Sequence, residues 1–338
     1  MSDYFLLYAN CHVTKGIKRS LIVDTLRGRY YFIPNSMGKI IRLLKKKSIE
    51  EVKITLPTLE QFTFEEYLNY LIKLELGFIT NQPKSFPDIG ISFEEPCLLN
   101  NCVFDVNKFS RYDLIEGIKK IDSIGCSYLQ IRSYDDYLNY ETIKEILQEL
   151  HFSSFKSVYI TTQFNNEDSS KILNLLDMNL RLSVLIFHSA PFDEEIKKDY
   201  HHYYLVKEKI VDESCCGIVN EDYFISNIKF YLESLKFNSC LNKKIGIDKN
   251  GFVKNCPSSK IIYGNINEIN VEKLLCNSEF TETWKINKSQ ISICKICEFR
   301  NICQDCRIYT KDNTNLDPNN FEKPLKCNYN PYNLSWEK

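Results

Sequence analysis

The last third of the chain contains cysteines at regular spacing. Two CxxC pairs, Cys294–Cys297 and Cys303–Cys306, are separated by only five residues. Thiolates at this spacing converge on one point where the backbone turns tightly, and soft metals and iron–sulfur clusters are bound in this way. Single cysteines before and after the pairs extend the set to seven members: Cys240, Cys256, Cys294, Cys297, Cys303, Cys306 and Cys327. We therefore predict a metalloprotein.

The kind of metal is left open by spacing alone. Two clusters with four cysteine ligands each need eight thiolates, so a set of seven is close to that requirement. Four cysteines in CxxC pairs also bind structural zinc. A zinc site is therefore the alternative to iron and sulfide.

A predicted β-hairpin lies between the first two cysteines of the set. Ile245–Asp248 and Phe252–Lys254 are strand-like, and Asn250-Gly251 between them is a strong turn signal. Because Cys240 and Cys256 flank this hairpin, we expect the fold to bring the two thiols together.

Composition describes an ordinary globular protein. The 338 residues are 43% hydrophobic, and the formal net charge of −1 argues against nucleic acid as a main partner. The first residues have no basic region followed by an apolar one, and no apolar run approaches membrane-spanning length, so neither a signal peptide nor a membrane segment is expected. We expect a cytoplasmic protein, where its 14 cysteines stay reduced and unpaired.

Residues 1–85 are predicted to form a small winged-helix-like domain. Leu21–Asp24 and Arg29–Ile33 form a hairpin signal around Arg27-Gly28, and helical patterns follow. This segment has 13 Lys and Arg against 8 Asp and Glu, a net charge of about +5. Such a domain could bind an acidic peptide along a strand edge, or DNA, or serve as a lid without a ligand.

Residues 86–220 alternate between helix-like and strand-like segments. Strand-like runs at Tyr128–Arg132, Ser157–Thr162 and Leu182–Phe187 follow helical patterns. This alternation predicts βαβ units around a parallel sheet, either a partial barrel or a doubly wound sheet. The predicted fold class is therefore α/β.

Residues 221–338 carry a recognisable cysteine register. A cysteine, a hairpin glycine, a second cysteine, "CKICEFRNICQDCR" and a terminal cysteine follow one another from Cys240 to Cys327. This register resembles the SPASM domain, the auxiliary iron–sulfur module of radical-SAM peptide maturases, and in particular the grasp-with-SPASM type. The resemblance is specific over residues 236–330. Its third and fourth cysteines are separated by two residues, whereas most members of the family have three.

The resemblance implies two [4Fe–4S] clusters and a distribution of their ligands. One cluster would be bound by Cys294, Cys297, Cys303 and Cys327. The other would be bound by Cys240, Cys256 and Cys306, with the eighth position filled by Cys276, Cys215, Cys216, a substrate or water.

The S-adenosylmethionine site of the family is missing from this sequence. Radical-SAM enzymes have a CxxxCxxC loop, whereas this chain offers only Cys97 and Cys102, with four residues between them. The family's Gly-Gly-Glu segment is matched in position by Arg132-Ser133-Tyr134, whose side chains would obstruct a cofactor. We therefore do not expect S-adenosylmethionine to be bound.

The combined prediction has three parts: a leader-recognition domain (1–85), a degenerate radical-SAM-like α/β barrel (86–220) and a SPASM iron–sulfur domain (221–338). By resemblance, the chain takes part in maturing a ribosomally synthesised peptide together with an ATP-grasp ligase, by presenting the precursor or by transferring electrons. The alternatives are a redox enzyme with an unrecognised active site and a zinc-ribbon regulator that binds DNA.

Overall fold

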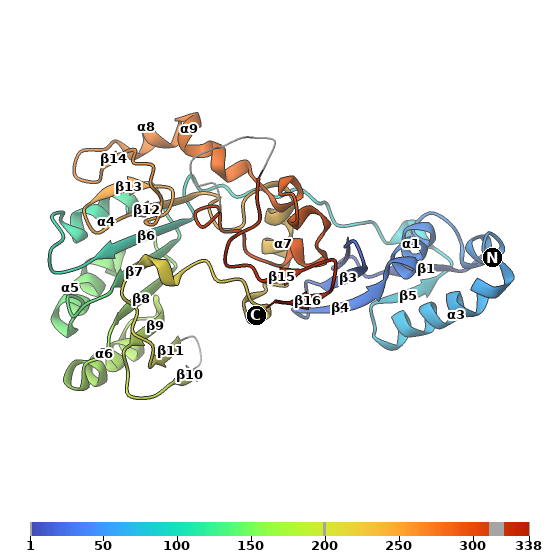
Figure 1. Cartoon of the computed structure of the whole chain (residues 1–338), viewed down its shortest axis with the longest axis horizontal. Coiled ribbons are helices and arrows are strands. Elements are labelled where there is room, and N and C mark those ends of the chain that lie inside the picture. The colour runs from blue at the N-terminus through green and yellow to red at the C-terminus, as the bar shows by residue number, and fades with distance from the viewer. Residues whose placement is uncertain (1, 199–200, 311–320, 338) are drawn as a thin grey trace.

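The computed structural model describes residues 2–198, 201–310 and 321–337. The molecule is elongated: the N-terminal elements form one end, a large sheet forms the other, and the cysteine-rich segment lies between them (Figure 1). No helix among the described residues is long and apolar enough to cross a membrane.

The N-terminal part combines two small antiparallel sheets with three helices. The predicted hairpin is confirmed as the two strands β3 and β4, while β1, β2 and α2 were not predicted. One sheet has the order β2-β3-β4, and the other pairs β1 with β5. The bounds are β1 (Tyr4–Leu7), β2 (Cys11–Lys15), β3 (Arg19–Asp24), β4 (Arg29–Pro34), α1 (Asn35–Leu44), α2 (Ile49–Ile54), α3 (Thr58–Lys73) and β5 (Gly77–Thr80).

Both faces of strand β3 are buried. Successive side chains of a strand point to opposite faces. Ile22 packs into the core formed with α1 and α3. Leu21 and Val23 belong to a second core, which they share with Phe299 and Ile302 of the cysteine-rich segment. The three-stranded sheet is therefore packed between its own helices and the cysteines.

The large sheet has nine strands in the order β10-β11-β9-β8-β7-β6-β12-β13-β14. Six consecutive strands, from β11 to β12, run parallel. The predicted mixed α/β class with a mostly parallel sheet is therefore confirmed, and β10 and β14 form the edges. The bounds are β6 (Asn101–Val106), β7 (Tyr128–Ser133), β8 (Ser157–Gln163), β9 (Leu182–His188), β10 (Glu194–Lys198), β11 (His201–Val206), β12 (Lys244–Ile247), β13 (Phe252–Lys254) and β14 (Gly264–Asn265).

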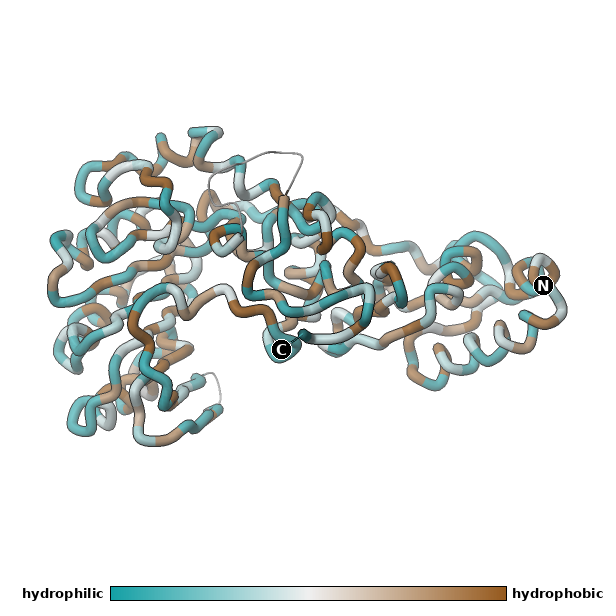
Figure 2. The backbone as a smooth tube through the Cα atoms, viewed as in Figure 1, coloured by the Kyte–Doolittle hydropathy of each residue, from teal (hydrophilic) through white to brown (hydrophobic). Residues whose placement is uncertain are grey.

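Three crossover helices cover one face of this sheet: α4 (Leu114–Asp122), α5 (Tyr140–Glu149) and α6 (Asn166–Met178). Each is amphipathic, and its apolar stripe joins the apolar residues of β6 to β9 in the main core. Hydrophobic and hydrophilic residues accordingly alternate in colour along the helices of the backbone tube (Figure 2). The parallel arrangement follows from these helical crossovers.

The second predicted hairpin, between Cys240 and Cys256, is present as β12 and β13, and it extends the large sheet. Gly251 has φ +83° and donates its backbone N–H to the Asp248 carbonyl at 2.8 Å, as the turn requires. Strand β12 pairs in parallel with β6. The domain boundary that we expected near residue 221 therefore does not separate this hairpin from the large sheet. The remaining elements are α7 (Ile228–Lys236), α8 (Val271–Leu275), α9 (Ser278–Thr281), β15 (Tyr329–Asn330) and β16 (Ser335–Trp336).

Candidate metal centres

A first pocket is lined by four cysteines. They are Cys294, Cys297, Cys303 and Cys327, the four that the resemblance assigns to one cluster. Two short 3-10 helices, η7 (Cys294–Ile296) and η8 (Glu298–Asn301), turn the backbone between the first three. The Cys327 backbone forms a parallel bridge with Val219, which lines the same pocket.

A second pocket is also lined by four cysteines. Cys240, Cys256 and Cys306 were predicted to lie together, and the structure adds Cys216 to them. Val219 lines both pockets, so the two are neighbours. Of the three cysteines considered for the eighth position, Cys216 is therefore the one at this pocket.

The other two candidates lie elsewhere. Cys276 is exposed and lines an open surface pocket beside Tyr263 and Ile269. The Cys215 thiol does not line the second pocket, and its strongest charged neighbour is Arg132. Chain order alone could not separate Cys215 from Cys216, because the difference is only which of two successive side chains points inward.

The second pocket is assembled by four segments of the chain, which carry Cys216, Cys240, Cys256 and Cys306. Cys240 follows α7, and its backbone N–H donates to the Asn238 side chain at 3.0 Å. Cys256 follows β13 at the end of the hairpin. Gly217, next to Cys216, has φ +85°, and a Cβ there would lie 3.1 Å from the Cys306 sulfur. A glycine is thus needed at this point both for its conformation and for space.

Burial raises the pKa of five of these thiols when they have no metal partner: Cys240, Cys294, Cys297, Cys303 and Cys306. It raises the pKa of Cys240 and of Cys294 to about 12. The bound metal in a thiolate site replaces the thiol protons, so metal binding and deprotonation would occur together here.

Each pocket also contains one lysine. The Lys288 Nζ lies 2.6 Å from the Cys303 sulfur, and the Lys244 Nζ lies 3.8 Å from the Cys240 sulfur. Burial lowers the pKa of each lysine, but the neighbouring cysteines raise it by more, so both lysines have a pKa above the usual value. Sequence reasoning missed these residues, since a lysine carries no spacing signal.

The donor set fits an iron–sulfur cluster. Four thiols line each pocket, and a [4Fe–4S] cluster takes four thiolates. Within residues 2–198, 201–310 and 321–337, no three His, Cys, Asp or Glu side chains are grouped as ligands of a single metal ion.

The segment between Cys297 and Cys303 is also the docking site of the N-terminal sheet. Glu298 is fully buried and accepts from Arg19 Nε at 2.7 Å. Arg300 donates to the Lys15 carbonyl at 2.6 Å, and Thr14 donates to the Asn301 side chain at 3.1 Å. The N-terminal sheet and the first pocket are therefore directly connected, which the sequence did not reveal.

The segment Arg132-Ser133-Tyr134 lies at the carboxyl end of β7. Arg132 is buried and donates to both carboxylate oxygens of Asp105 on β6, at 2.7 and 3.0 Å. The Tyr134 hydroxyl also donates to Asp105, at 3.3 Å. Cys102 is buried in the main core, and only Cys97 is partly exposed. An ion pair thus occupies the edge of the sheet where ligands of α/β proteins bind.

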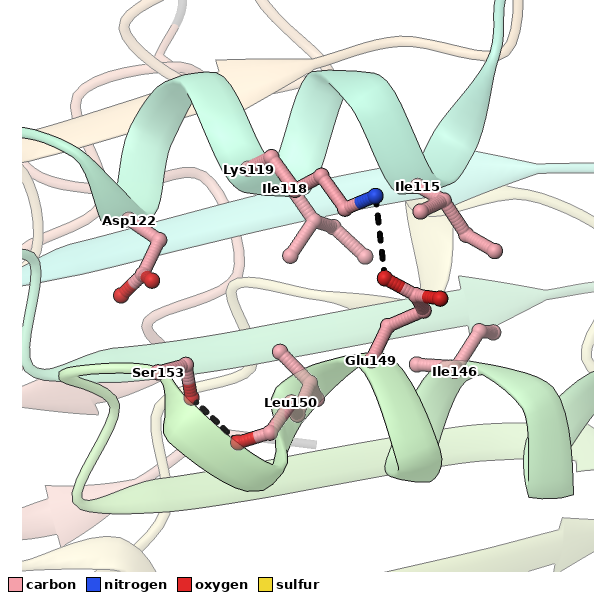
Figure 3. A pocket seen from close by; sticks show the side chains of 8 residues that line it. All are labelled: Ile115, Ile118, Lys119, Asp122, Ile146, Glu149, Leu150 and Ser153. Carbon is pink, nitrogen blue, oxygen red and sulfur yellow. Dashed lines mark hydrogen bonds and ion pairs between the residues drawn. The ribbon is translucent and has the colours of Figure 1, made fainter.

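A further pocket lies between α4 and α5, outside the cysteine-rich segment. Ile115, Ile118 and Ile146 give it apolar walls, and Lys119 pairs with Glu149 across it at 2.9 Å (Figure 3). Its lining contains no thiol or imidazole. We regard it as a groove left by the packing of two helices.

No protein-family profile matches the chain, and no curated protein matches its sequence. Similar solved structures include two of SuiB from Streptococcus suis, one of them bound to S-adenosylmethionine. Each is 11% identical with a TM-score of 0.33, and the matches cover 95% and 94% of this chain and 99% of SuiB. A likeness this distant carries no argument about fold or activity.

Proposed function

We propose that each of the two pockets holds one [4Fe–4S] cluster. The ligands would be Cys294, Cys297, Cys303 and Cys327 in the first pocket, and Cys216, Cys240, Cys256 and Cys306 in the second. The observation that carries this proposal is that eight cysteines line two neighbouring pockets in two sets of four. Four thiolates are the ligand number that such a cluster takes.

The proposed role is the maturation of a ribosomally synthesised peptide together with an ATP-grasp ligase. The cysteine register from Cys240 to Cys327 supports it, since this register resembles that of the grasp-with-SPASM maturases. The chain would bind the precursor and transfer electrons through its clusters. Cleavage of S-adenosylmethionine is not part of the proposal, because the sequence has no CxxxCxxC loop and Arg132 and Asp105 fill the corresponding edge.

The precursor would bind along β4. Among the described residues, β4 pairs only with β3, so its outer edge is open to a further strand. An extended peptide added to such an edge gains main-chain hydrogen bonds. The excess of basic residues in residues 1–85 favours an acidic peptide.

Metal and sulfide analysis of protein purified without air tests the clusters. We expect about eight irons and eight sulfides per chain. Cys216→Ala should retain about half of the iron, because only the second pocket loses a ligand. Cys276→Ala, the matched control, should retain all of it. Two zinc ions in place of iron would refute the proposal, and equal iron in both variants would refute the assignment of Cys216.

Hydrogen exchange tests the peptide site. Acidic peptides selected from a display library against the intact protein should slow amide exchange in Arg29–Pro34. Protection of the large sheet alone, or failure of acidic peptides to bind better than basic ones, would contradict the assignment of β4.

A further inference from the structure

One lysine lies among the thiols in each cysteine pocket. Lys288 is 5% exposed, and its ammonium donates to the Cys303 sulfur and to the Gln304 carbonyl, at 2.6 and 2.8 Å. Lys244 lies 3.8 Å from the Cys240 sulfur and is partly exposed. The same pairing of a lysine with a ligand sulfur therefore occurs twice, at sites built from different segments.

The charge of Lys288 is balanced only in part by a carboxylate, since Asp305 is near enough to raise its pKa but forms no direct ion pair with it. No Asp or Glu among the described residues lies within ion-pair distance of it. The adjacent Asp305 accepts from Arg307 and Asn238 instead, each at 2.9 Å. An ammonium ion is costly to bury unless an anion is beside it. The anion that this pocket can provide is the thiolate set itself.

We propose that Lys288 and Lys244 are positioning residues that set the reduction potentials of the two clusters, one residue for each pocket. This inference rests on the proposed function, because it requires clusters in both pockets. The lysines do not ligate iron. They place a positive charge and an N–H donor beside a ligand sulfur.

The two lysines should act to different extents. A nearby cation and a hydrogen bond to a ligand sulfur both stabilise the reduced cluster, which carries one more negative charge, so both raise its reduction potential. The Lys288 ammonium lies 2.6 Å from its sulfur and the Lys244 ammonium lies 3.8 Å from its sulfur, so the Coulomb interaction is stronger for Lys288. The first pocket should therefore hold the cluster with the higher potential.

Anaerobic potentiometric titration, followed by electron paramagnetic resonance, tests this on the full chain. Lys288→Met and Lys244→Met keep an unbranched side chain that is one atom shorter and remove its charge. Lys295→Met is the matched control, because Lys295 lies between Cys294 and Cys297 but is exposed. Iron is measured first in every sample, and absence of iron from the wild-type protein would refute the proposed clusters themselves.

With iron present, we expect Lys288→Met to move one midpoint potential to more negative values and Lys244→Met to move the other by less. Lys295→Met should move neither. If Lys288→Met keeps its iron and shifts no midpoint more than Lys295→Met does, the inference is wrong while the clusters stand. If Lys288→Met loses iron, Lys288→Arg is measured in its place. This variant should retain iron and have a midpoint potential near the wild-type value. Loss of iron from Lys288→Arg would also refute the inference.

Discussion

Replacement of Arg19 by methionine should loosen the N-terminal sheet from the cysteine-rich segment. Arg19 lies on β3, and its Nε is 2.7 Å from a carboxylate oxygen of Glu298, which is fully buried. The same oxygen accepts from the Tyr329 hydroxyl at 2.6 Å, and the other oxygen has no partner among the described residues. The arginine is therefore the only described cation that pairs with this buried charge.

The expected cost follows from the burial of the pair. Removing one partner of a buried ion pair costs about 3–5 kcal/mol. Arg19 remains 24% exposed and Tyr329 keeps its hydrogen bond to Glu298, so the loss should fall at the lower end of that range. The guanidinium also lies 3.5 Å from the centre of the Phe32 ring, a cation–π contact that contributes about 0.5–1 kcal/mol. We expect a total of about 3.5–4 kcal/mol.

Native-state hydrogen exchange measures this quantity locally. A loss of about 3.5–4 kcal/mol should speed exchange in β2 and β3 by roughly several hundredfold. Amides of β7, in the large sheet, should exchange at the wild-type rate. Arg29→Met is the matched control, because Arg29 lies on the neighbouring strand and its side chain is exposed.

A second substitution separates charge from shape. If the unpaired carboxylate is the cause, Glu298→Gln added to Arg19→Met should recover a large part of the lost stability, because it removes the buried charge. The reasoning is refuted if Arg19→Met changes exchange no more than Arg29→Met. It is also refuted if the double variant is no more stable than the single one.

Three further predictions concern the pockets and the large sheet. Gly217→Ala should lower the iron content by about half, because the new Cβ would lie 3.1 Å from the Cys306 sulfur in a left-handed conformation that costs about 1–2 kcal/mol; unchanged iron would contradict this. Arg132→Met should cost about 3–5 kcal/mol in urea unfolding by leaving Asp105 buried without its cation, and adding Asp105→Asn should recover part of the loss. Removing metal with a chelator should speed amide exchange in β3 more than in β7. The reason is that β3 packs on the segment between Cys297 and Cys303, two cysteines of the first pocket. Equal changes in both strands would count against this coupling.

Much of the fold could be predicted because its signals are local. The turn at Gly251, the hairpin formed by β3 and β4, and the alternation of helices and strands each depend on residues close together in the chain. The path of β12 could not be predicted in this way. It pairs with β6, more than a hundred residues earlier, and that pairing depends on the packing of the whole sheet.

The sequence by itself determined the first cysteine pocket almost completely. Cys294, Cys297 and Cys303 lie within ten residues, so two short turns are enough to bring their side chains together. Only the tertiary structure decided the fourth cysteine of the second pocket, where Cys216 meets cysteines that follow it by 24 to 90 positions. The same holds for Lys288 and Lys244, since a buried charge depends on which segments surround it and not on its neighbours in the chain.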